Sequence, residues 1–271
     1  MGRRLNFTLE EIKDICSSYN NGISRNKLKK KYHCSDNAIL RILKQNNIKI
    51  RSIQEANGNV NYTLNVDFFR TPSHNLGYLL GFLAADGTVH MKENMICLEL
   101  QQSDKEILGK LRIVIGNNRP ISEYTTKRGY KNSKLYFYNR EVKDILKTYR
   151  IVPNKTYDDY FGFPDKLPKE YLPDYLRGFT DGDGCFKITG VSPTWQIDST
   201  SRSFIEEWKK YLDSLGIYCM IASNKKTNVI LYRLYCYGNE KVKKIYNLLY
   251  GNNPELFLVR KKERVEEILE I

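Results

Sequence analysis

Several features are missing from this 271-residue sequence, and each absence narrows the class of protein that it can encode. No apolar run approaches the roughly 20 residues that a membrane-spanning helix needs. The first residues also lack the apolar stretch of a secretory signal. The chain is therefore expected to be soluble and intracellular, in a prokaryotic cytoplasm or in an organelle.

Histidine is scarce, and neither histidine nor cysteine forms a metal-binding pattern. The six cysteines are scattered without a C-x-x-C pair, and the three histidines do not complete a zinc motif. The pattern favours reduced, mostly buried thiols over a zinc site or a disulfide framework.

What the sequence has in excess is positive charge. Its 44 Lys and Arg outnumber 31 Asp and Glu, which gives a formal net charge of +13. Residues 1–51 alone hold 12 basic and 4 acidic side chains, a net charge of +8. Basic side chains gain affinity for polyanions through counterion release, so a nucleic-acid partner is indicated. Charge alone fits a basic soluble surface equally well, and motifs must decide.

Residues 1–50 predict a small helical domain with explicit start signals. Thr8 to Glu11 fits a capping box, Ser24 is suited to cap a second helix through Tyr32, and Ser35 a third from Asp36 to about Gln45. Apolar spacing predicts that the helices share a small core, made of Ile23, Leu28, Tyr32, Ala38, Ile39, Ile42 and Leu43.

This segment resembles a helix-turn-helix of the recombinase or resolvase type, whose third helix would read the major groove. A basic helical hairpin that binds a protein is the alternative, but apolar spacing and positive charge together favour DNA. The candidate DNA contacts are Arg25, Lys27, Lys30, Asn37, Arg41 and Lys44.

An Asn-rich stretch predicts a linker at residues 51–72, and the chain beyond it repeats itself. Gly81-Phe82-x-x-x-Asp86-Gly87 recurs 97 residues later as Gly178-Phe179-x-x-x-Asp183-Gly184. We expect two αββαββα units, at residues 73–168 and 169–271. The predicted fold class is thus α+β with antiparallel sheets, preceded by a small all-α domain.

Small residues in the two repeated helices predict a close helix pair. Gly81 and Gly178 would let the two backbones touch. Asp86 and Asp183 would then lie together at the negative ends of both helix dipoles, where two carboxylates repel one another without a cation. A single Asp-Gly pair would indicate only a helix stop, but two matching pairs favour bound divalent metal and, with DNA as partner, phosphodiester hydrolysis.

Residues 79–87, LLGFLAADG, and 176–184, LRGFTDGDG, resemble the paired motifs of a LAGLIDADG homing endonuclease. The resemblance covers about residues 73–271. It implies a monomeric enzyme that cuts both strands of a long asymmetric DNA target and leaves short 3′ overhangs, with saddle-shaped sheets lying along the major groove. It also implies two or three Mg²⁺ or Mn²⁺ ions between the helices, held by Asp86 and Asp183 and by the carbonyls of Ala85 and Gly182.

The resemblance further implies auxiliary residues. Gln101 and Asp198 occupy the place of a polar residue that orders metal-bound water. Lys155 and Lys261 match a basic residue near the scissile phosphate, with Lys262 as the alternative to Lys261. One face of each sheet would contact DNA through alternating side chains, namely Lys134, Tyr136, Tyr138, Arg233, Tyr235 and Tyr237.

Ala84 departs from the motif, because the second copy has Asp181 there. That acid is structural in the family, so no loss of chemistry is expected. Two other functions remain open: a transcriptional regulator that has lost the acids, and an intron RNA maturase. Retention of Asp86 and Asp183 argues against the first, and the N-terminal DNA reader against the second.

Overall fold

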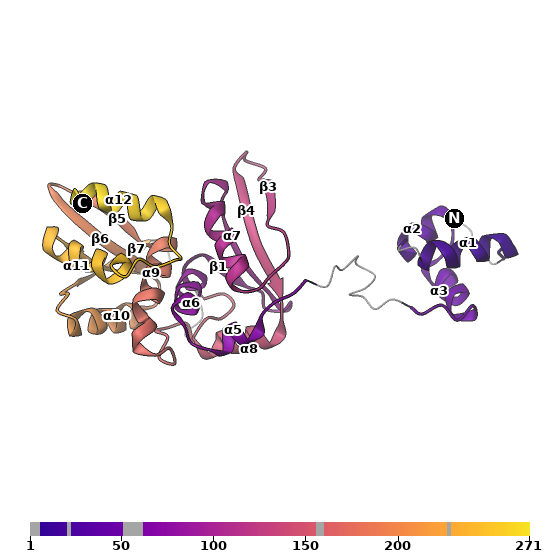
Figure 1. The fold of residues 1–271 in the computed structure, drawn as a ribbon, viewed down its shortest axis with the longest axis horizontal. Helices are drawn as coiled ribbons and strands as arrows, with labels where there is room; N and C mark the ends of the chain where they lie inside the picture. Colours follow the sequence, from indigo (N-terminus) through magenta and orange to yellow (C-terminus); the bar gives the residue numbers. More distant parts are fainter. Residues whose placement is uncertain (1–5, 21–22, 51–61, 156–159, 227–228) are drawn as a thin grey trace. The chain divides into compact units, whose positions relative to one another are not determined.

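The computed structural model describes residues 6–20, 23–50, 62–155, 160–226 and 229–271. The chain divides into two units, at residues 1–62 and 63–271 (Figure 1). In these ranges, no helix has both the length and the apolar character needed to cross a membrane.

The smaller unit contains helices at the predicted places: α1 (Leu9–Asn20), α2 (Arg25–Lys31) and α3 (Asp36–Gln45). The capping box is confirmed, since the Thr8 N–H donates to the Glu11 carboxylate at 3.0 Å and the Glu11 N–H donates to Thr8 Oγ1 at 3.2 Å. Ser24 and Ser35 cap α2 and α3 by accepting hydrogen bonds from backbone N–H groups. Local capping chemistry therefore sets where these helices begin.

The core of this unit differs in part from the prediction. Ile23 is 37% exposed and Ala38 is only partly buried, so neither belongs to the core. Ile23 lies before the cap of α2, in the connection, and α1 supplies Ile15 and Tyr19 in its place. The buried set is Ile15, Tyr19, Leu28, Tyr32, Ile39, Ile42 and Leu43.

The larger unit is a duplicated α+β fold, as predicted. Its first half contains α5 (Val66–Arg70), α6 (His74–Asp86), β1 (Gly87–Val89), β2 (Met95–Gln101), α7 (Lys105–Val114), β3 (Ser122–Thr125), β4 (Lys131–Tyr138) and α8 (Arg140–Thr148). Its second half contains α9 (Leu172–Asp183), β5 (Cys185–Thr189), β6 (Ser192–Ser199), α10 (Arg202–Ser214), β7 (Met220–Lys226), β8 (Val229–Tyr237), α11 (Asn239–Tyr250) and α12 (Val259–Leu269).

Each half forms a four-stranded antiparallel sheet, in the order β1-β2-β4-β3 and β5-β6-β8-β7. Helix α7 packs on β2 and β4, and α10 and α11 pack on β6 and β8. Burial alternates along β4 and β8, because side chains of a strand point to opposite faces in turn. The helices therefore cover one face of each sheet and leave the other open.

Two helices were not anticipated. Helix α5 falls inside the predicted linker, so that prediction extends too far: residues 63–72 belong to the larger unit, and residues 51–61 lie outside the described residues. Helix α12 packs against β5 and α11 and brings Lys261 back toward the repeated helices. Its cap residue, Leu258, makes no side-chain capping bond, so the sequence carried no start signal for it.

Candidate active site

Helices α6 and α9 pack backbone against backbone at the centre of the larger unit. A Cβ atom added at Gly81 would collide with the carbonyl oxygen of Tyr175, and one added at Gly178 would collide with that of Tyr78. The two contacts are related by the same offset of 97 residues, so the pairing is reciprocal. No side chain larger than hydrogen fits at either crossing position, and the C-terminal ends of the helices meet as a result.

The acids of both motifs lie at these adjoining ends. A Cβ atom at Gly182 would stand 3.0 Å from Oδ2 of Asp86, so the Asp86 carboxylate lies against the last turn of the opposite helix. Asp183 ends that turn and is the more exposed of the two acids. The structure thus brings together Asp86, Asp183, Gly182 and, one residue before Asp86, Ala85.

Lys155 and Lys261 each cap the end of their own motif helix. The Nζ atom of Lys155 donates to the carbonyls of Leu83, at 3.1 Å, and of Ala85. The Nζ atom of Lys261 donates to the carbonyls of Thr180, at 3.3 Å, and of Gly184. Both half-buried lysines therefore bind carbonyls at the end of a motif helix, and one acceptor of each, Leu83 and Thr180, is repeat-related.

Lys262 is oriented differently from Lys261. Its Nζ atom lies 3.6 Å from the Glu266 carboxylate and 5.0 Å from the centre of the Phe257 ring. It therefore packs along α12 while Lys261 reaches the end of α9, and of the two lysines left open by the sequence it is Lys261 that reaches the acids.

Burial makes the charges in this cluster interact strongly. It raises the pKa of Asp86 to about 6, with a further contribution from the negative charge of Asp183, while Lys155, Lys261 and Arg260 oppose the shift. Burial also lowers the pKa of Lys155 to about 8, against the stabilising effect of the two acids. Asp183 is partly open to solvent as a residue, but its carboxyl group is largely surrounded by protein atoms. Burial of that group raises the pKa of Asp183. The cluster is a partly desolvated set of oxygen donors and ammonium groups.

Gln101 and Asp198, at equivalent strand ends, differ in their hydrogen bonding. Gln101 is exposed at the end of β2, opposite Asn132. Asp198 lies at the equivalent place on β6, where Arg233 Nε donates to Oδ1 at 2.7 Å and Nη2 donates to Oδ2 at 2.8 Å. Both oxygens of Asp198 are therefore engaged by Arg233, a pairing that the sequence analysis did not predict.

The open faces of the sheets carry the side chains proposed for DNA contact. Lys134, Tyr136 and Tyr138 alternate with buried residues on β4, and Arg233, Tyr235 and Tyr237 do so on β8. Arg119 joins them: its guanidinium lies 4.5 Å from the centre of the Tyr136 ring, and Nη1 donates to the Tyr136 hydroxyl at 3.0 Å. Arg119 comes from a loop, so no strand periodicity could have pointed to it.

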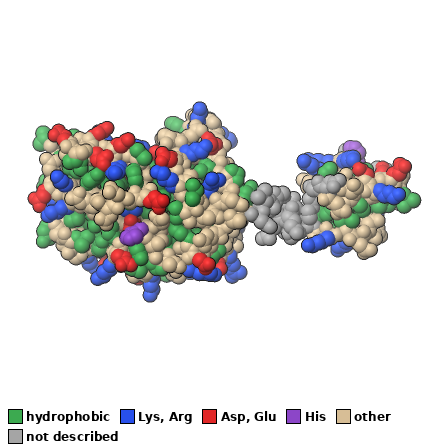
Figure 2. Space-filling model, viewed as in Figure 1, with side chains coloured by type: hydrophobic (Ala, Val, Ile, Leu, Met, Phe, Trp, Pro, Cys, Tyr) green, Lys and Arg blue, Asp and Glu red, His purple; other side chains and the backbone are tan. Residues whose placement is uncertain are grey.

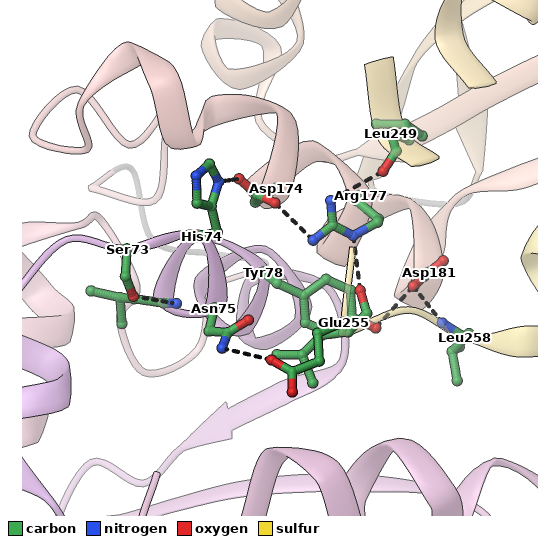
Figure 3. A network of polar contacts seen from close by, with 12 residues as sticks. Ser73, His74, Asn75, Tyr78, Asp174, Arg177, Asp181, Leu249, Glu255 and Leu258 are labelled. Atoms are coloured by element: carbon green, nitrogen blue, oxygen red, sulfur yellow. Dashed lines mark hydrogen bonds and ion pairs between the residues drawn. The ribbon is translucent and has the colours of Figure 1, made fainter. Parts of the chain in front are cut away.

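A polar network ties the second motif helix to the rest of the larger unit (Figure 3). The buried carboxylate of Asp181 accepts hydrogen bonds from the hydroxyls of Tyr78, at 2.8 Å, and Tyr250, at 3.0 Å, and from the Leu258 N–H at 2.7 Å. Burial raises the pKa of Asp181 to about 6. Since Leu258 precedes α12, Asp181 fixes the start of the helix that carries Lys261.

A buried arginine extends this network toward the start of α6. Arg177 donates to the carbonyls of Leu249 and Leu256 and to Asp174, which also lies 2.7 Å from His74 Nδ1. Each of the three guanidinium nitrogens, Nε, Nη1 and Nη2, thus donates to a protein group (Figure 3). These contacts hold α9 against α6 and against the segment that precedes α12.

In the smaller unit, most of the candidate DNA contacts are exposed. Asn37, Arg41 and Lys44 are spaced by four and three residues, so they share one face of α3. Lys27 and Lys30 are exposed on α2, whereas Arg25 is half-buried and pairs with Asp36 at 3.3 Å. Figure 2 shows Lys and Arg side chains on the visible face of each unit.

Sequence comparison finds related proteins over much of the chain. The LAGLIDADG-like domain family matches residues 170–249. An uncharacterized protein of Methanocaldococcus jannaschii is 28% identical over 215 residues, which cover 77% of this chain and 73% of that protein. The ribonucleoside-diphosphate reductase NrdEB subunit alpha of Bacillus subtilis is 27% identical over 170 residues, 56% of this chain but only 15% of the subunit.

Solved structures resemble the larger unit at low sequence identity. The I-LtrWI LAGLIDADG homing endonuclease bound to target DNA has a TM-score of 0.50 and 12% identity, and covers 75% of this chain and 89% of its own. The meganuclease I-SmaMI bound to uncleavable DNA has a TM-score of 0.50 and 13% identity, and covers 72% and 88%.

Proposed function

We propose that this chain, which carries a LAGLIDADG-like domain within a duplicated LAGLIDADG fold, is a site-specific endonuclease that cuts both strands of DNA. The observation that carries the proposal is the retention of both motif acids, Asp86 and Asp183, at the adjoining ends of α6 and α9. Lys155 and Lys261 flank the acids, as a reaction that builds negative charge on a phosphate requires.

The donor set fits a divalent ion such as Mg²⁺ or Mn²⁺. In the described ranges, no cluster of three or more His, Cys, Asp or Glu side chains is arranged to hold a metal. Two carboxylates, water, the DNA phosphates and the main-chain carbonyls of Gly182 and Ala85 would have to share the coordination, which hard cations accept. The Ala85 carbonyl accepts from Lys155 in this structure and would have to be shared with that ammonium group. Such an ion would polarise the scissile phosphate and make bound water a stronger nucleophile.

The residues of the chain itself have three tasks in this proposal. Asp86 and Asp183 would hold the cation, one acid for each strand that is cut. Lys155 and Lys261 keep ammonium groups beside the helix ends, where they stabilise charge on the phosphate oxygens. Gln101 and Asp198 orient water, which for Asp198 requires that Arg233 turn from it toward the DNA.

Recognition of the target is assigned to two surfaces. The open sheet faces, with Lys134, Arg233 and their neighbouring tyrosines, would lie along the major groove of a long target. The exposed face of α3, with Arg41 and Lys44, would read additional base pairs outside that footprint. Because the two sheets differ in their open-face side chains, we propose that one copy of the chain binds an asymmetric sequence.

The test is cleavage and binding by the full chain on duplexes selected from a randomised library in Mg²⁺. Asp86→Asn and Asp183→Asn should each abolish double-strand cleavage and leave binding in Ca²⁺ nearly intact, and a chelator should stop the wild-type reaction. Asp144→Asn, at an exposed position of α8, is the matched control and should cut normally.

Other outcomes would assign the chain differently. If the wild-type chain binds a selected sequence but does not cut it in either Mg²⁺ or Mn²⁺, the chain is a DNA-binding regulator. Splicing of an intron RNA stimulated by a chain that cuts no duplex would identify a maturase. Normal cutting by either Asn variant would remove the acids from the mechanism.

A further inference from the structure

Arg260 links the two halves of the larger unit at the edge of the acid cluster. This second residue of α12 donates from Nε to both oxygens of Asp104, at 2.9 and 3.0 Å, and its Nη2 lies 2.9 Å from Oδ2. Asp104 belongs to the first half, where it precedes α7, and its side chain is 9% exposed. A cation of the second half is thus anchored on the first in the two-point geometry that arginine and carboxylate favour.

The ion pair leaves part of the guanidinium available. Its contacts with Asp104 use Nε and Nη2, while 55% of the Arg260 side chain is exposed. Arg260 directly precedes Lys261, the lysine that donates to carbonyls at the end of α9. Its partner Asp104 follows β2 in the half that carries Asp86, so the guanidinium lies against that half, next to Lys261.

Among the residues that the structure describes, the other half of the site shows no equivalent of this pair. The residue before Lys155 is Asn154, whose amide contacts the Met91 sulfur at 3.1 Å. The residue 97 positions after Asp104 is Ser201, which caps α10. At the repeat-related positions neither the arginine nor its anchoring acid recurs, so the pair of Arg260 with Asp104 distinguishes one half of the described site from the other.

We propose that Arg260, held in place by Asp104, contacts a backbone phosphate of the DNA on the Asp86 side and supports cleavage of one strand more than of the other. A guanidinium fixed along one edge and exposed along the other suits a phosphate oxygen, because little side-chain entropy is lost on binding. The strand inequality rests on the proposed nuclease function, whereas the phosphate contact requires only that the chain bind DNA.

The first measurement is the salt dependence of binding to a selected duplex in Ca²⁺, with R260A, R260Q and the control R264A. Arg264 lies on the same helix, is 53% exposed and pairs with Glu267. Loss of one phosphate contact should lower the slope of log affinity against log salt by about 1, as each contact contributes roughly that amount. R264A should keep the wild-type slope.

The second measurement follows each strand separately on the same duplex, end-labelled, in Mg²⁺. R260A should slow one strand by roughly tenfold more than the other, so that nicked DNA accumulates. D104N keeps the arginine charge but weakens its anchor. It should therefore retain most of the salt slope, while the cleavage rates of the two strands should become unequal. R260K should restore the slope without restoring the strand balance.

The outcomes separate this inference from the proposed function. A wild-type chain that binds but does not cut rejects the nuclease, yet a reduced slope in R260A would still support the phosphate contact. Folded R260A and R260Q proteins that keep the wild-type slope overturn the contact. If the slope falls but both strands slow equally, the asymmetric role is rejected.

Discussion

The Tyr78 hydroxyl on α6 donates a 2.8 Å hydrogen bond to Asp181 on α9, in the buried contact between the two halves. The repeat-related residues, 97 positions away in each case, are Tyr175 and Ala84. The acid is therefore missing from the second pair, and the Tyr175 hydroxyl is buried with no hydrogen-bond partner among the described residues. The pair of Tyr78 with Asp181 is thus hydrogen-bonded, whereas the repeat-related pair of Tyr175 with Ala84 is not.

This difference predicts opposite effects of the same substitution at two sites. Tyr78→Phe removes a donor from a buried carboxylate and should lower the free energy of unfolding by about 1–3 kcal/mol. Tyr175→Phe removes an unpaired buried hydroxyl and should leave stability unchanged or raise it slightly. Urea denaturation of both variants tests this, and equal losses would show that the Tyr175 hydroxyl is bonded after all.

Glycine substitutions test the backbone contact of α6 with α9. Gly81→Ala and Gly178→Ala force a methyl group into a carbonyl of the opposite helix and should each cost about 1–3 kcal/mol or more. Gly109→Ala on α7 is the matched control, because nothing lies within 4 Å of an added Cβ there. It should stabilise the protein by about 0.5–1 kcal/mol. Melting temperatures that fall equally in all three would reject the helix contact.

Adjacent lysines on α12 should differ in their effect on cleavage. Lys261→Ala removes the ammonium group at the end of α9 and should reduce the cleavage rate by roughly 10²–10³-fold. Lys262→Ala breaks a contact with Glu266 along the helix and should change the rate little. Single-turnover cleavage with saturating enzyme separates these effects from binding, and similar losses in both variants would contradict the assignment.

Removing the smaller unit should alter affinity more than chemistry. A chain that begins at residue 63 keeps every proposed catalytic residue but loses the basic side chains of α2 and α3. Its DNA footprint should shorten and its salt slope should flatten, while the core site is still cut at high enzyme concentration. An unchanged footprint and slope would indicate that this unit binds a protein instead.

Features with local causes were predictable from the sequence. The caps at Thr8, Ser24 and Ser35 and the ends of α6 and α9 follow from side chains within a few residues of the backbone they serve. The duplication predicted the succession of helices and strands along both halves, because a repeated pattern of turns and alternation predicts a repeated fold.

Features that depend on long-range contacts were not predictable in the same way. The pairs Arg233 with Asp198 and Arg260 with Asp104 join residues separated by 35 and 156 positions, and no local pattern marks either. Helix α12 lacks a capping side chain, and α5 is only 5 residues long, so both fell below what periodicity can detect. These elements are positioned by the packing of the finished fold.

The contact of α6 with α9 at Gly81 and Gly178 has a further consequence for how this protein can diverge. Because main-chain atoms meet at these two positions, the approach of the helices there does not depend on the size or rotamer of a side chain in the contact. Substitutions elsewhere in either half can change its stability or its surface while this main-chain contact is kept. The two sheets can therefore acquire different side chains independently of the contact that joins the two motif helices.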